Sequence, residues 1–107
     1  MSGQDSQIRE ASQCVSMADL RTEIDRLDRL LVRLLSDRQR YIERAAEIKS
    51  RRAEIRDQAR IDDVLAKVAE EAERAGLDPG LARAVWLVLM ERSIEIEFAA
   101  FDSQRAK

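Results

Sequence analysis

Basic residues are spread along the first predicted helix of this chain at spacings that could place them around a small anion. Arg38 and Lys49 are 11 residues apart, close to three helical turns, so their side chains share a face about 16 Å apart. Arg21 lies 17 residues before Arg38, about 25 Å away and turned by about 100°. Arg21 therefore does not easily reach the same site within one chain, whereas the Arg21 of a second, antiparallel copy could.

A serine and a glutamate on the last predicted helix form a second group. Ser93 and Glu97 are four residues apart and share a helix face. The neighbouring Ile94, Ile96 and Phe98 predict that both are partly buried. Cations, carboxylates and a hydroxyl held on helices can bind a small polyanion and stabilise charge that develops in a reaction. An ordinary interpretation stays open for each residue, because most of the 19 basic residues must be solvated surface.

Other common catalytic groups are missing from the sequence. The chain has no histidine, so it has no histidine base and no histidine metal ligand. It also has no P-loop and no GxGxxG motif. Its lone cysteine, Cys14, can form no internal disulfide, which fits a reducing compartment. We therefore expect no metal site.

Composition predicts a single helical, soluble domain and a cytoplasmic location. The chain has 107 residues, of which 37% are charged and 45% apolar. Its net charge of −2 argues against non-specific nucleic-acid binding. It has no apolar run long enough to span a membrane and no signal-peptide core. Residues 1–16 are polar and aperiodic and are expected to form a flexible leader to a helical domain at 17–107, with Met17 as a candidate alternative start.

The longest predicted element is the helix that carries the basic residues. Apolar residues recur at spacings of three and four from Leu20 to Ile48, which predicts a helix over about residues 18–53, with Asp19 able to cap its start. Its rhythmic part alone spans about 45–55 Å, whereas a compact monomer of this length has a radius of gyration of about 13 Å. The helix is therefore expected to bury its apolar stripe against a second copy of the chain.

Two shorter helices complete the predicted fold. The charge-rich stretch 50–60 loses the apolar rhythm and predicts a loop, and a second helix follows over about 60–75. A GLDP sequence then supplies a helix-ending glycine, an aspartate cap and a first-turn proline for a third helix over about 79–102. No strand alternation appears, so the predicted fold class is all-α, with a long, a short and a medium helix.

Taken together, these motifs resemble the all-helical chorismate mutase family. The resemblance covers about residues 18–101 and is carried by ADLRTEIDRLDRLLVRLL, DRQRYIERAAEIK, RDQAR, GLDP and ERSIEIE. Its most specific parts are the LRxxIDxxD opening and the arginine–lysine spacing. Members of the family are intertwined homodimers with three helices per chain and two shared sites. They convert chorismate to prephenate by a Claisen rearrangement, with no cofactor and no covalent intermediate.

The resemblance implies roles for the basic residues of the first helix. Arg21 would cross from the partner chain to a substrate carboxylate, and Arg38 would bind a carboxylate from its own chain. Lys49 would donate to the ether oxygen, on which negative charge grows as the carbon–oxygen bond breaks.

The resemblance also implies roles for residues beyond the first helix. Asp57 and Arg60 would lie near the ring hydroxyl and the loop side of the pocket. Ser93 would support a carboxylate, and Glu97 would be the second donor to the ether oxygen. Many bacterial members have glutamine at this last position. A glutamate donates only in its protonated form, which burial favours.

A second departure from the family pattern opens an alternative substrate. Many mutases have glutamate after the arginine matched by Arg60, where this chain has Ile61. The isochorismate–pyruvate lyases, a related branch, resemble the chain in having an apolar residue there. The expected substrate is thus a small dicarboxylate, chorismate or isochorismate. The alternatives to a chorismate mutase are such a lyase, an aminodeoxychorismate mutase, or a non-catalytic helical dimer that acts as a regulatory or interaction module and lacks convergent cations.

Overall fold

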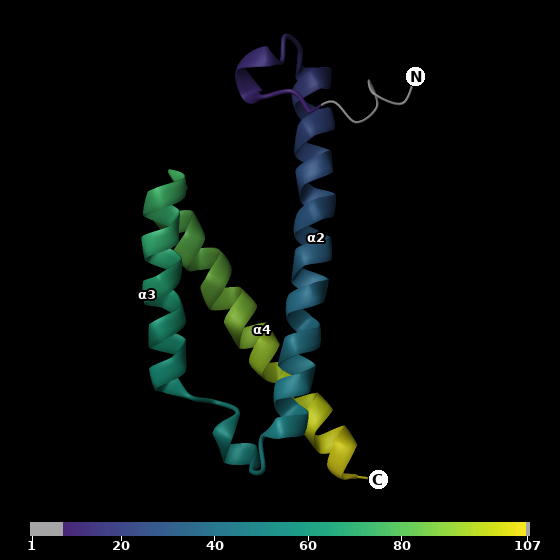
Figure 1. The fold of residues 1–107 in the computed structure, drawn as a ribbon, viewed down its shortest axis with the longest axis vertical. Helices are drawn as coiled ribbons and strands as arrows, with labels where there is room; N and C mark the ends of the chain where they lie inside the picture. The colour runs from purple at the N-terminus through teal and green to yellow at the C-terminus, as the bar shows by residue number, and fades with distance from the viewer. Residues whose placement is uncertain (1–7, 107) are drawn as a thin grey trace. The chain divides into compact units, whose positions relative to one another are not determined.

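The computed structural model describes residues 8–106, and across that range the chain forms helices and no strand (Figure 1). The elements in chain order are a 3-10 turn η1 (Ala11–Gln13), α2 (Met17–Ile48), a 3-10 turn η2 (Arg52–Glu54), α3 (Gln58–Ala75) and α4 (Pro79–Arg105). The predicted all-α class with a long, a short and a medium helix is confirmed. The structure consists of two units, which divide between Arg38 and Gln39 within α2.

The first unit holds the start of α2 through side-chain contacts to the backbone. Ser16 Oγ accepts a hydrogen bond from the Asp19 amide at 3.1 Å, so Ser16 caps the helix and the expected cap at Asp19 is wrong. Asp19 lies inside the first turn, where its carboxylate accepts from the Val15 amide at 3.0 Å and pairs with Arg9 at 2.7 Å. The hydrogen bond from Val15 is the main reason that the pKa of Asp19 is lowered.

The apolar stripe of α2 is exposed on the chain. Five of its large side chains are between 45% and 56% exposed, namely Ile24, Leu27, Leu31, Leu34 and Leu35. Burial of a large aliphatic side chain contributes about 1.5–3 kcal/mol. A row of such side chains left in water is a strong driving force for association.

The end of α2 differs from the expected one, because the helix stops at Ile48 rather than near residue 53. Glu54 Oε2 accepts hydrogen bonds from the amides of Ser50 and Arg51, each at 3.0 Å. These amides are therefore not available to carbonyls one turn earlier, which a continuing helix requires. The Arg51 amide is also the main reason that the pKa of Glu54 is lowered. A side chain thus ends the helix where the sequence has neither glycine nor proline.

The hairpin of α3 and α4 forms as the GLDP motif predicts (Figure 1). Gly76 ends α3 with a φ of 73°, in the left-handed region that favours glycine. The Leu77 amide then donates to the Ala72 carbonyl at 2.8 Å. The Asp78 side chain caps α4, and Pro79 occupies its first turn. This junction fixes two antiparallel helices side by side.

A small apolar core forms where the last turn of α2, the segment after η2 and the C-terminal half of α4 meet. Its buried members are Ala46, Ile55, Ile94 and Phe101, and the partly buried Ile61, Phe98 and Ala100 pack against it. The core holds the end of α2 against α4. In the part of the chain that the structure describes, every helix is too short or too polar to cross a membrane.

Candidate active site

A lysine at the end of α2 and a glutamate of α4 form a close ion pair beside this core. Lys49 Nζ donates to Glu97 Oε2 at 2.6 Å. The Glu97 side chain is only 6% exposed, whereas that of Lys49 is 29% exposed. Such a charge-assisted hydrogen bond is short and strong. The carboxylate thus lies at the bottom of the site, and the ammonium lies where a solute can reach it.

Helical spacing explains why these two residues meet. Ile94, Glu97 and Phe101 recur at intervals of three and four on α4 and so share one face. Ile94 and Phe101 pack in the same core as Ala46, which is fully buried in the last turn of α2. Glu97 lies between Ile94 and Phe101 on this face, and so it lies next to the end of α2. Lys49 is the residue that follows Ile48 there.

Ser93 lies one turn before Glu97 on the same face of α4. Both residues are buried, at 8% and 5% exposed, which confirms the burial predicted from their apolar neighbours. Ser93 Oγ donates to the Leu89 carbonyl at 2.7 Å within the helix. A serine hydroxyl can act both as a donor and as an acceptor. The site therefore holds a buried hydroxyl and a buried carboxylate one turn apart.

The predicted site residues at the start of α3 have local partners in this structure. Asp57 caps α3 by accepting from the Arg60 amide at 3.2 Å. The Arg60 guanidinium pairs with Asp63 at 2.7 Å and is largely exposed. Lys67 reaches the same Asp63 oxygen at 2.8 Å, and its hydrogen bond is the main cause of the lowered pKa of Asp63. Arg60 is therefore directed along α3.

Ile61, the residue after Arg60, lies on a different face of α3. It is partly buried and packs against the apolar core, which includes Ile94 and Phe101, the residues that flank Glu97 on α4. A branched aliphatic side chain there offers no hydrogen bond to a hydroxyl. At this position α3 thus presents an apolar side chain to the core, and the role of Ile61 in the site remains a prediction.

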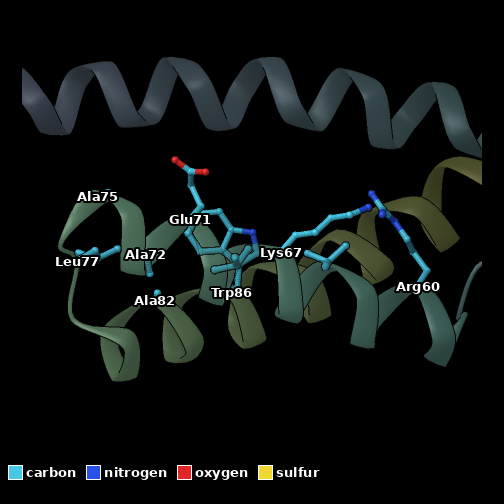
Figure 2. Close-up of a pocket in the computed structure, with 10 residues that line it drawn as sticks. Arg60, Lys67, Glu71, Ala72, Ala75, Leu77, Ala82 and Trp86 are labelled. Atoms are coloured by element: carbon cyan, nitrogen blue, oxygen red, sulfur yellow. The ribbon is translucent and has the colours of Figure 1, made fainter.

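A groove of about 430 Å³ lies between α3 and α4 and was not foreseen from the sequence (Figure 2). Ala72, Ala82 and Trp86 are among its apolar lining residues, and Arg60 and Lys67 lie at one end. Figure 2 shows the charged ends of Arg60 and Lys67 converging. The signal in the sequence was the apolar spacing over about residues 60–75, which predicted a helix there but not a groove beside it.

Two other predicted site residues, Arg21 and Arg38, belong to the first unit. Arg21 is exposed near the start of α2, and Arg38 is partly buried. The pair of Lys49 and Glu97 is built wholly from the second unit, so the roles of the two arginines remain predictions. Within residues 8–106, no three Cys, Asp or Glu side chains gather closely enough to hold a metal ion.

Comparison with known proteins agrees with this all-helical architecture. The sequence model of the chorismate mutase type II family matches residues 20–98, and the chain belongs to that family. The family predicted from the motifs is thereby confirmed. The chain is also similar to an isochorismate pyruvate lyase of Pseudomonas aeruginosa, with 37% identity over 65 residues. That match covers 61% of this chain and 64% of the relative, so it spans less than two thirds of the relative's length.

Proposed function

We propose that this chain is a homodimeric chorismate mutase, which converts chorismate to prephenate. The observation that carries the proposal is the contact of 2.6 Å between Lys49 Nζ and the buried Glu97 carboxyl group. In this Claisen rearrangement the ether carbon–oxygen bond breaks while a carbon–carbon bond forms, and no group leaves the molecule. The reaction needs no nucleophile. It needs a compressed conformer and a donor at the ether oxygen, where charge develops.

Lys49 and Glu97 are the two candidate donors to the ether oxygen. The Lys49 ammonium is a donor as it stands, and it is exposed enough to meet an incoming oxygen. Glu97 accepts from Lys49 in the free chain, so it must take up a proton before it can donate to the ether oxygen. Substrate binding is therefore expected to be coupled to proton uptake.

The homodimer is supported by the apolar surface that one chain leaves exposed. Besides the stripe on α2, the α4 residues Leu81, Val85 and Val88 are 46–65% exposed. An antiparallel arrangement would cover these faces and let the partner's Arg21 bind a substrate carboxylate. Arg38 would bind a carboxylate from its own chain. A monomeric mass at micromolar concentration, measured by light scattering, would contradict this arrangement.

An isochorismate–pyruvate lyase is the second candidate. Ile61 favours it, because this apolar residue removes a hydrogen bond that the ring hydroxyl of chorismate would otherwise meet, and the relative from Pseudomonas aeruginosa is named for that activity. The lyase reaction breaks the same ether bond, so Lys49 would keep its role. An aminodeoxychorismate mutase would use the same groups. The interaction-module alternative predicts a pocket without convergent cations, and the pair of Lys49 with the buried Glu97 is the feature that favours a catalytic site over it.

One assay separates these candidates. Purified protein is offered chorismate and isochorismate separately, and the products are resolved by chromatography. The proposal expects prephenate from chorismate, with near-complete loss of turnover in Lys49→Ala. Glu91→Ala is the matched control, since Glu91 is an exposed residue of α4 that pairs with Arg56. Faster release of pyruvate from isochorismate would establish the second candidate, and turnover of neither compound would refute both.

A further inference from the structure

Arg105, the last residue of α4, holds the backbone of the catalytic lysine. Its Nη1 donates to the Ala46 carbonyl at 2.9 Å, and its Nη2 donates to the Lys49 carbonyl at 2.6 Å. Glu97, two turns earlier on α4, accepts from Lys49 Nζ. One helix therefore holds Lys49 at both ends, by its carbonyl and by its ammonium.

The carbonyls that Arg105 binds are left open by the way α2 ends. In a continuing helix the Ser50 amide would donate to the Ala46 carbonyl. Here that amide donates to Glu54 instead, and Ala46 itself is fully buried. A buried carbonyl without a partner is costly. Arg105 supplies the missing donor and adds a positive charge at the carboxyl end of α2, where the helix dipole favours it.

The guanidinium of Arg105 is itself fixed in place. It lies over the Phe101 ring, with the guanidinium carbon 3.7 Å from the ring centroid. Phe101 is 8% exposed and belongs to the core that packs on Ala46. A planar fork held on an aromatic face loses little further freedom when it binds two acceptors. The contact to the Lys49 carbonyl is thus preorganised.

We propose that Arg105 is a positioning residue, which sets the location of the Lys49 ammonium relative to Glu97 and so relative to the ether oxygen of the substrate. The inference rests on the proposed function for the role of Lys49, and on the two carbonyl contacts for the role of Arg105. A displacement of about 1 Å at a reacting centre can cost about 100-fold in rate. Loss of the fork should therefore lower turnover while leaving the substrate-binding cations in place.

Arg52 offers a matched control for Arg105. It also stacks on a phenylalanine of α4, with its guanidinium carbon 4.3 Å from the Phe98 centroid. Its hydrogen bonds go to the Asp102 carboxylate at 2.9 and 3.3 Å. Arg52 thus ties the segment after α2 to the same end of α4 without holding the Lys49 carbonyl.

The test compares Arg105→Ala, Arg105→Lys and Arg52→Ala in the full chain. Arg105→Ala should lower kcat by about 10- to 100-fold, with KM changed by much less. Arg105→Lys, which keeps the charge and one donor, should recover part of the loss, and Arg52→Ala should stay close to the parent. Equal losses of kcat in the two alanine variants would mean general loosening of the helix end and would overturn the proposal. Unchanged kcat in Arg105→Ala would overturn it as well.

A second readout does not depend on turnover. The protein is treated with a limiting amine-acylating reagent, and labelling of Lys49 is compared by mass spectrometry with that of Lys67, whose side chain is 68% exposed on α3. The ratio of Lys49 to Lys67 labelling should rise several-fold in Arg105→Ala and stay unchanged in Arg52→Ala. If the parent converts neither substrate, the proposed function fails, and the ratio of Lys49 to Lys67 labelling alone tests the positioning role of Arg105. A rise then supports the positioning role, and an unchanged ratio overturns it.

Discussion

Replacement of Glu97 by glutamine tests the chemistry of the site most directly. In the free chain the Glu97 carboxylate accepts from Lys49 at 2.6 Å and is 6% exposed. A glutamine keeps the shape and can still accept from Lys49 through its carbonyl, while its amide is a donor that does not titrate. The substitution therefore separates the donor role of residue 97 from its role as an anion.

The contact between Lys49 and Glu97 sets the expected size of the effects on stability and on rate. A hydrogen bond to a charged group contributes about 1.5–3 kcal/mol, and Glu97→Gln keeps a weaker neutral version of it. We expect a loss of about 1–2 kcal/mol in the free energy of unfolding. Glu97→Ala removes one preorganised donor, which costs about 2–4 kcal/mol of transition-state stabilisation, or about 30- to 1,000-fold in rate.

The pH dependence of activity gives the sharpest contrast. If only protonated Glu97 donates to the ether oxygen, the parent activity falls on the alkaline side by about tenfold per pH unit. Glu97→Gln should flatten that limb and hold its activity at higher pH. Calorimetric binding of a dicarboxylate transition-state analogue, in buffers of different ionisation enthalpy, should show uptake of about one proton by the parent and none by Glu97→Gln.

Three results would refute this reasoning. They are a Glu97→Gln profile parallel to that of the parent, full activity in Glu97→Ala, or equal proton uptake by the parent and the glutamine variant. Each would leave Lys49 as the only donor to the ether oxygen. Glu91→Gln changes an exposed carboxylate of the same helix and should leave the profile of the parent unaltered.

Further predictions concern the dimer, the substrate and the end of α2. Arg21→Ala and Lys49→Ala should each nearly abolish activity, and subunit exchange between the two dimers should restore one site per heterodimer; exchange without recovery excludes shared sites. Ile61→Glu should raise turnover of chorismate in a mutase and lower the native activity in a lyase, and unchanged rates would place Ile61 outside the site. The pKa of Glu54 is lowered in the fold, chiefly by the Arg51 amide, so its stabilisation is present above the unfolded pKa and lost as pH falls through the folded one. The difference in Tm between the parent and Glu54→Ala should therefore shrink on acidification, and a constant difference would contradict this account.

Local features of the fold could be predicted from the sequence. The recurrence of apolar residues defined the three helices, and the GLDP junction was confirmed at Gly76 and Asp78. These features depend on residues within a few positions of one another, so their physics is present in any short window. The shared face of Ser93 and Glu97 follows in the same way from a spacing of four. Family membership also followed from such local motifs, and the family match confirms it.

Contacts between distant residues needed the tertiary structure. Lys49 and Glu97 are 48 residues apart, and Arg105 and Ala46 are 59 apart. Helical periodicity does not predict which turns of two helices pack against each other. The pairing of turns depends on how small and large side chains fit together across the core. The end of α2 at Ile48 was missed for a different reason. Its stop signal is local, because Glu54 accepts from amides only three and four residues before it, but the signal is a glutamate side chain rather than a glycine or a proline. The sequence therefore determined the helices and the candidate donors, and packing on Ala46 decided which of them touch.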